Sequence, residues 1–206
     1  SVVGETDEVG LLLSGEISPH NFQLKPSQVL KIQDAKVIFY ISDNLESPIL
    51  KLLKDTSDEV KKIEVINESN LTLLPIRVGG VWEKHKHDEH NQDHNEEHKH
   101  NGHNQDQIDV HIWLDPNNAI NILKTIENVL SNSFPKNLKS YKLNADKAIK
   151  NIINVKNKIE NQLNLISDES YLVFHDAFQY FEKTYDLNGV GSIVFEPDEL
   201  PSANRI

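Results

Sequence analysis

The chain has 206 residues, a formal net charge of −11 and no cysteine. This length allows one large domain or two small ones, and the charge argues against a nucleic-acid partner, because phosphate binding needs clustered Lys and Arg. The absence of cysteine excludes disulfides, thiolate zinc sites and Cys nucleophiles. The sequence shows no transmembrane stretch and no signal peptide. It starts at Ser1, lacks Met and ends in PSANRI, which resembles the start of a helix, so we expect a chain truncated at both ends.

The first part of the chain alternates between strand and helix patterns. A short apolar run at residues 9–13 predicts a strand, which a loop follows. Residues 26–35 have helical spacing with Pro near the first turn, and residues 37–41 form the continuous apolar run of a buried parallel strand. Helical spacing returns at 45–54, and 63–66 predicts another short strand. This order indicates βαβ units within an α/β layer.

A strongly polar segment follows at residues 83–106. It has no hydrophobic residue, and carboxylates are threaded between its imidazoles. This composition cannot bury a core and predicts a mobile, solvated loop, for which a plain polar linker is the alternative interpretation. Its seven histidines are His85, His87, His90, His94, His98, His100 and His103. Imidazole binds zinc, copper and nickel, so we expect the loop to collect metal ions weakly, while a specific site lies elsewhere.

The longest helical pattern lies in the second half of the chain. Before it, Asp115 as N-cap and Pro116 at the first position predict a helix that extends to residue 130. Residues 138–166 then carry one apolar stripe in steps of three and four. This stripe predicts a long helix that spans two lobes, with a coiled-coil seam as the alternative. The remaining predicted elements are a strand at 171–174, a helix at 175–183 and a strand at 193–195.

Three histidines outside the loop occupy junctions between predicted elements. His20 follows the first predicted strand, His111 precedes a helix by a few residues, and His175 ends the apolar run at 171–174. Ligands of open α/β sheets bind at the carboxyl ends of strands, where such loops converge. Three imidazoles from separate loops make a typical zinc shell with a fourth position for water or a carboxylate. The residues alone leave two interpretations, a three-histidine metal site or three unrelated surface or core histidines.

The sequences around these three histidines resemble motifs of one family. SPHNF followed by LKPS, at 18–27, resembles the SPHxF/Y-x-L-x-P-S signature of the cluster A-I metal-binding proteins. HIWLDP, at 111–116, looks like their H-x-W-L-x-P motif, and VFHDAFQYFE, at 173–182, is similar to FHDAF-x-Y-F. These proteins are the solute-binding components of zinc and manganese ABC importers. The acidic, His-rich insertion resembles a mark of their zinc-specific, ZnuA-like branch, and the resemblance covers nearly the whole chain.

The resemblance implies an α/β fold of two lobes, each a parallel sheet with flanking helices, joined by one long rigid helix. The expected divisions are an N-terminal lobe at 1–137 that includes the loop, a linking helix at 138–166, and a partial C-terminal lobe at 167–206. The second lobe is expected to be incomplete, because the chain lacks the last part of the family pattern. His20 and His111 would come from the first lobe and His175 from the second, with the metal ion in the cleft.

The resemblance also implies which ion is bound. Manganese-type members place a carboxylate where His175 stands, and a third imidazole favours Zn²⁺ over Mn²⁺. Pro19 occupies a position where some zinc members carry Glu, so the fourth ligand stays open. Asp176 could orient an imidazole or cap the following helix, and we expect the cap. Trp113 and Phe178 either wall the cleft or belong to the core, and we expect the core.

Together these features predict a binding protein and not an enzyme. The expected function is high-affinity zinc capture by the solute-binding component of an ABC zinc importer, which delivers the ion to an inner-membrane permease. We expect a monomer in the periplasm or another extracytoplasmic, membrane-associated location. The alternatives are a manganese-binding homologue and a metal-buffering or adhesin-like surface protein that acts through the loop. A zinc hydrolase is disfavoured, since the sequence has no HExxH motif and no base at helical spacing from a ligand.

Overall fold

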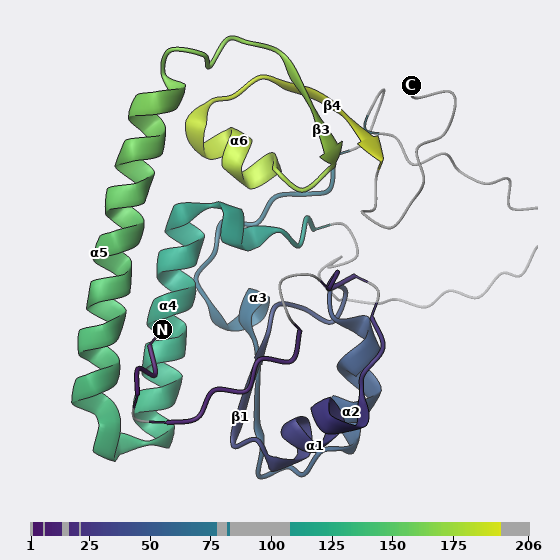
Figure 1. The fold of residues 1–206 in the computed structure, drawn as a ribbon, viewed down its shortest axis with the longest axis vertical. Coiled ribbons are helices and arrows are strands. Elements are labelled where there is room, and N and C mark those ends of the chain that lie inside the picture. Colours follow the sequence, from purple (N-terminus) through teal and green to yellow (C-terminus); the bar gives the residue numbers. More distant parts are fainter. Residues whose placement is uncertain are drawn as a thin grey trace, which may run out of the picture.

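The computed structural model describes residues 2–5, 7–13, 17–20, 22–77, 82 and 108–194. They form two parallel two-stranded sheets with surrounding helices, connected by one long helix (Figure 1). The strands are β1 (Val37–Tyr40), β2 (Lys61–Glu64), β3 (Tyr171–His175) and β4 (Gly189–Val194), and β1 pairs with β2 and β3 with β4. The helices are α1 (Pro26–Asp34), α2 (Leu50–Asp55), α3 (Val65–Glu68), α4 (Pro116–Ser133), α5 (Leu138–Leu163) and α6 (Gln179–Tyr185), with single 3₁₀ turns η1 (Ser47–Ile49), η4 (Ile112–Leu114) and η5 (Pro135–Asn137). The predicted α/β class is confirmed.

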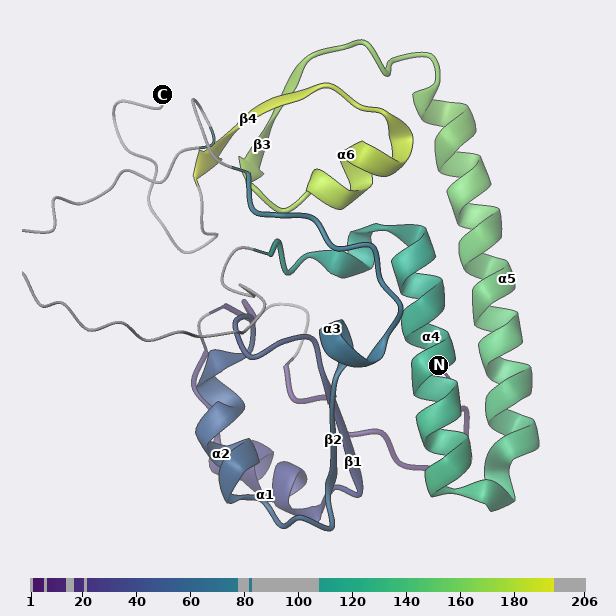
Figure 2. The ribbon, with the colours of Figure 1, turned by 180° about the vertical axis from the view of Figure 1, so that it is seen from behind.

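The β1–β2 sheet has helices on both faces, which explains the unbroken apolar run of β1. Figures 1 and 2 show this sheet between α1 and α2 on one side and α4 on the other. Ile38 belongs to a core cluster with Ile32 of α1 and Leu53 of α2, whereas Phe39 packs against the cluster that contains Leu130 of α4. Alternate residues of β1 therefore enter two different cores. Because both faces of the strand are covered, apolar side chains are favoured at every position of β1.

The structure differs from the predicted elements at three places. An apolar run reports burial and does not distinguish a strand from a helix. Val65 and Ile66 are buried as expected, yet they lie in α3 and not in a strand. At the other end, His175 still pairs with Val194, so α6 begins four residues later than predicted, at Gln179. Residues 9–13 form no strand either, which makes that prediction wrong.

Helix α5 runs along α4 in its first half and continues to the second sheet (Figure 1). Tyr141 and Ala145 are 0% and 3% exposed and pack in one cluster with Val2 and Leu130. The helix ends at Leu163, three residues before the predicted end, and a turn follows. Among the described residues its packing partner is α4 of the same chain, which favours the helix that spans two lobes over the coiled-coil alternative. Across the ranges described above, no helix has the length and apolar character needed to cross a membrane.

Helix α6 of the second lobe is anchored in the core of the first lobe by Tyr180. This side chain is 1% exposed and belongs to a cluster with Ile66, Leu74 and Ile112. Its hydroxyl accepts a hydrogen bond from the Leu74 amide at 3.0 Å and donates one to the Asp109 carbonyl at 2.8 Å. Because both backbone groups belong to the first lobe, the tyrosine fixes α6 in a defined place on that lobe.

A β-bridge joins the chain on the two sides of the His-rich segment. Pro75 pairs with Ile108 in antiparallel fashion, and the Asp109 amide donates to the Leu74 carbonyl at 2.9 Å. The His-rich segment itself, and with it the expectation of a mobile loop, lies outside the described residues. The bridge places the chain that leads to His111 independently of that segment.

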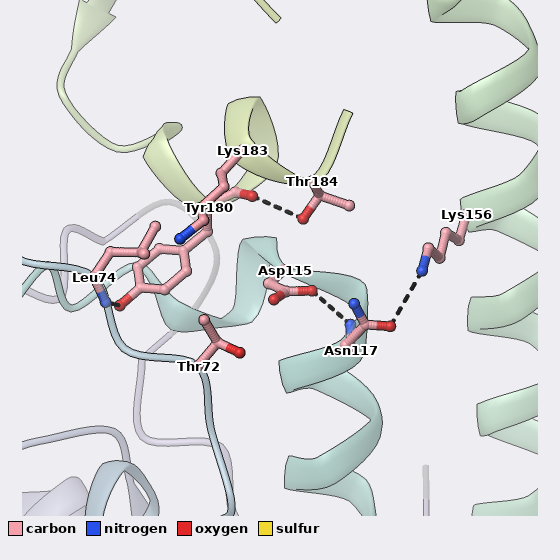
Figure 3. A pocket seen from close by; sticks show the side chains of 8 residues that line it. All are labelled: Thr72, Leu74, Asp115, Asn117, Lys156, Tyr180, Lys183 and Thr184. Atoms are coloured by element: carbon pink, nitrogen blue, oxygen red, sulfur yellow. Dashed lines mark hydrogen bonds between the residues drawn. The ribbon is translucent and has the colours of Figure 1, made fainter. Parts of the chain in front are cut away.

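A cavity of about 260 Å³ lies between the start of α4, helix α5 and helix α6 (Figure 3). Its lining includes Leu74 and Tyr180, and across it Lys156 of α5 donates to the Asn117 side chain at 3.2 Å. Beside it, the Asp115 side chain accepts from the Asn117 amide at 2.7 Å, which confirms the predicted N-cap of α4. No histidine lines this cavity, so it is separate from the site described next.

Candidate metal centre

The three histidines outside the loop lie together. Their candidate ligand atoms are all within 4.8 Å of one another, and the ring centroids are 5.4 Å apart for His20 and His111 and 5.5 Å apart for His111 and His175. Two nitrogens on one tetrahedral zinc ion, each about 2.0–2.1 Å from it, are about 3.4 Å apart. The separations between the ligand atoms therefore exceed what a bound ion would require by no more than about 1.4 Å. In the part of the chain that the structure describes, no carboxylate joins these three imidazoles.

Each histidine comes from a different segment of the chain. His20 follows a bend in which its amide donates to the Ser18 hydroxyl at 3.3 Å. His111 is the residue directly before η4, which leads into α4. His175 is the last residue of β3 and therefore lies at the carboxyl end of a parallel strand, the usual place for ligands in such sheets. Two segments precede α5 and one follows it, so the site depends on how the two lobes meet.

His111 is prepared as a metal ligand by its surroundings. It is 8% exposed, and its Nδ1 lies 2.7 Å from Oδ1 of Asp109, which also accepts from the His111 amide at 3.0 Å. A carboxylate partner places the proton on Nδ1 and leaves a lone pair on Nε2. That Nε2 is buried and has no hydrogen-bond partner. An unpaired buried acceptor is costly, and a metal ion would satisfy it.

Asp109 is a residue of the candidate site that the sequence analysis missed. It is 6% exposed, although Asp is rarely buried without a partner. The sequence did contain a signal for this contact. Asp109 lies two positions before His111, and at that spacing a carboxylate can reach the histidine ring within a single turn of the chain. The orienting role was considered for Asp176 instead, and that residue forms an ion pair with Arg77.

Three expectations for neighbouring residues were wrong. Helix α6 has Phe178 as its N-cap and no side-chain cap, so Asp176 does not cap it. Trp113 and Phe178 are 38% and 40% exposed and do not belong to the core. Trp113 instead meets the His111 ring edge-on, with centroids 5.5 Å apart. The seven histidines of the loop lie outside the described residues, so their relation to this site stays a prediction.

Tyr180 contributes to the site as a hydrogen-bond donor and not as a base. Burial, above all, raises the pKa of Tyr180 to about 12, and the charges of Asp109 and Asp115 act in the same direction. The hydrogen bond from the Leu74 amide lowers the pKa but does not outweigh burial. The phenol therefore keeps its proton at neutral pH and holds the Asp109 carbonyl, which steadies the residue that orients His111.

Proteins that resemble the chain in sequence include two zinc proteins. The chain is 32% identical over 212 residues to the high-affinity zinc uptake system protein ZnuA of Brucella abortus, with 95% of this chain and 64% of the relative covered. It is 29% identical over 205 residues to the zinc-binding protein AdcA of Streptococcus pyogenes, with 100% of this chain and 39% of the relative covered. The chain thus spans less than two thirds of the length of either relative.

The fold also resembles that of solved structures. The Zn(II)-bound AdcA of Streptococcus pneumoniae superposes with a TM-score of 0.70 at 28% identity, over 99% of this chain and 38% of that one. A family model matches residues 1–206, which is the entire chain. The protein therefore belongs to the ZnuA family, described as the periplasmic zinc-uptake complex component A.

Proposed function

We propose that the protein binds one zinc ion through His20, His111 and His175 and serves as the solute-binding component of an ABC zinc importer. The observation that carries this proposal is the convergence of three imidazoles from three segments on one point, with the His111 Nε2 buried and unpaired. Three nitrogen donors without a carboxylate suit Zn²⁺ better than Mn²⁺, which prefers oxygen. The names of the zinc-uptake and zinc-binding relatives support the same ion.

The proposed shell is suited to capture and release. Three imidazoles leave one tetrahedral position for water or for a ligand from another part of the protein. His20 and His175 are partly exposed, whereas His111 is buried, so the ion can approach from the side of the first two. An exposed side of this kind permits exchange with a partner protein, which a closed four-ligand structural site would slow.

The wider assignment follows the family. We infer a periplasmic or other extracytoplasmic location, delivery of zinc to an inner-membrane permease, and a monomeric protein in which residues 1–137 and 167–206 are lobes on either side of a linker at 138–166. Membership of a family of uptake components argues against the zinc hydrolase alternative. The lobe boundaries agree with the position of α5, Leu138–Leu163, between the two sheets.

The test of the proposed function is zinc titration calorimetry on the 206-residue chain and on a chain that lacks residues 83–106. We expect one tight site in both proteins, because none of the three ligands lies in the deleted segment, and additional weak sites only in the longer one. Loss of the tight site on deletion would instead assign the function to the His-rich segment, as a metal buffer. Equal affinity for manganese in the shortened chain would contradict the choice of zinc.

Two substitutions of Asp109 should weaken zinc binding to different extents. Asp109→Ala removes the acceptor that fixes the His111 ring, and loss of such a partner typically costs about 10- to 100-fold in metal affinity. Asp109→Asn keeps an oxygen at the same place and loses only the charge, so we expect a smaller loss. Competition against a fluorescent zinc chelator measures both. Equal affinities for the wild type and Asp109→Ala would show that this carboxylate does not orient the ligand.

A further inference from the structure

Arg77 connects the two lobes beside the candidate metal centre. It lies in the first lobe, two residues after the bridge residue Pro75, and its ion-pair partners among the described residues, Asp176 and Glu182, lie in the second lobe. Its Nε donates to Oδ2 of Asp176 at 3.2 Å, Nη2 pairs with the other oxygen of Asp176, and Nη1 pairs with Glu182 of α6. The guanidinium thus forms a two-pronged contact with one carboxylate and a single contact with the other.

This cluster is largely shielded from water. The side chains of Arg77, Asp176 and Glu182 are 17%, 11% and 7% exposed, and the ring of Trp82 covers the guanidinium at 3.6 Å from its centroid. Glu182 is seated so closely against Gly189 that a Cβ there would collide with its carboxylate. Surface ion pairs are loosely held, whereas charged groups enclosed in this way keep a fixed geometry.

The position of the cluster matters because its members are neighbours of the ligands. Asp176 directly follows His175, and the Ala177 amide donates to the His175 carbonyl at 2.9 Å. On the other lobe, the bridge between Pro75 and Ile108 lies three residues before His111. A short continuous path therefore leads from His111 through the bridge and Arg77 to the peptide that carries His175.

We propose that Arg77 is a positioning residue that sets the place of His175 relative to His111 and His20 and thereby the zinc affinity of the site. This inference rests on the proposed binding of zinc by the three histidines. The planar fork of Arg fixes the direction of the Asp176 carboxylate, which the point charge of Lys cannot do. Arg77 itself does not touch the ion, and its effect is transmitted through the residue after His175.

A simpler role for Arg77 would be to neutralise two buried carboxylates. Removal of one partner of a buried charge cluster is disruptive whatever else that partner does. Two variants separate these roles: Arg77→Met alone, and the triple variant Arg77→Met, Asp176→Asn, Glu182→Gln, in which no uncompensated charge remains. Positioning predicts that both bind zinc about 10- to 100-fold more weakly than the wild type. Neutralisation alone predicts that the triple variant recovers the wild-type affinity.

The affinity measurement needs conservative and matched controls. Arg77→Lys keeps the charge and loses the fork, so positioning predicts only partial recovery. Lys62→Met removes a cation whose side chain donates to the Thr56 carbonyl, away from the triad, and should leave zinc affinity unchanged. The visible spectrum of bound Co²⁺ gives a separate readout, because its intensity changes when a ligand leaves the tetrahedral shell. We expect a changed spectrum in Arg77→Met and the wild-type spectrum in Lys62→Met.

A measurement without metal isolates the positioning role. The chain has no cysteine, so Lys51→Cys in α2 and Lys183→Cys in α6 give two unique, exposed sites for spin labels. Pulsed dipolar spectroscopy on the apoprotein should show a broadened or shifted distance distribution when Arg77→Met is added. An unchanged distribution, or full affinity in the triple variant, would overturn the proposal. Absence of a tight zinc site in the wild type would instead contradict the proposed function, and the distances would still decide the role of Arg77.

Discussion

We expect zinc affinity to fall by on the order of 100-fold or more when His111 is replaced by alanine. A structural zinc site contributes about 10–16 kcal/mol, which is about 3 kcal/mol for each of four ligands, and each 1.4 kcal/mol corresponds to a tenfold change. His111 should account for the largest share of the three, because its ring is buried and already oriented by Asp109. Calorimetry or chelator competition on the chain without residues 83–106 gives the affinity directly.

The stability of the apoprotein provides the control for His111→Ala. The substitution removes the unpaired Nε2, but it also removes the Nδ1 that contacts the buried Asp109 carboxylate, which then accepts only from the backbone amide of residue 111. We therefore expect a loss of about 1–3 kcal/mol of unfolding free energy in the apoprotein, while zinc should raise the melting temperature of the wild type and not that of the variant. In the full 206-residue chain, His103→Ala, outside the triad, should keep the tight site. Wild-type affinity in His111→Ala would exclude the proposed site.

The second large effect is expected on stability, at Tyr180. Tyr180→Phe leaves the Leu74 amide and the Asp109 carbonyl without their partner, and each buried unpaired group costs about 1–3 kcal/mol. Tyr180→Ala also opens a cavity where the two lobes meet, and this truncation of a large aromatic side chain adds about 3–5 kcal/mol. Urea denaturation followed by circular dichroism measures both losses. We expect the second lobe to detach from the first before or together with global unfolding.

Tyr185 provides a matched control in the same helix. It is 8% exposed, and its hydroxyl is buried without a hydrogen-bond partner. Tyr185→Phe removes an unsatisfied polar atom and should be neutral or stabilising, in contrast to Tyr180→Phe. If the two substitutions cost the same, the hydrogen bonds of Tyr180 would not be the source of the loss.

The same residue, Tyr180, predicts a change at alkaline pH. Its pKa is about 12 in the folded protein, whereas the ordinary pKa of a tyrosine in an unfolded chain is 10.0. The unfolded state therefore loses the phenolic proton first as the pH rises, so the contribution of this group to stability is present below pH 10 and is lost between pH 10 and about pH 12. Tyr180→Phe should reduce the pH dependence of stability in that window, as urea denaturation at a series of pH values would measure.

The sequence predicted the fold best where the local signal was strong. Strands β1 and β3 were marked by continuous apolar runs. The start of α4 was marked by an Asp followed by a Pro, and Asp115 is its N-cap. The errors arose where one apolar run crosses an element boundary, as at Val65 and Ile66, or where apolar residues stay exposed. Val9 and Leu11 are 62% and 72% exposed, and nothing in their sequence alone reveals that they lack a partner strand among the described residues.

The site was predictable in its ligand candidates and not in its supports. His20, His111 and His175 stand at junctions between elements, which by itself left two interpretations, and the family resemblance of their motifs predicted that they converge. Arg77 could not be found in this way, because its partner Asp176 is 99 residues away in the chain. An ion pair between residues so far apart in the chain forms only when the two lobes meet. How the lobes meet depends in turn on the packing of Tyr180 and α6 against the first lobe.

The bridge between Pro75 and Ile108 has a consequence for how this protein can vary between species. It fixes both ends of the insertion, so His111 is placed by the bridge and not by the residues in between. The entropy of closing a segment grows only with the logarithm of its length, and a doubling costs about 0.6 kcal/mol. We expect the number of histidines in the insertion to vary widely among homologues with little effect on the tight site. On the proposed roles of the insertion and the triad, we expect capacity for metal to change between homologues separately from affinity.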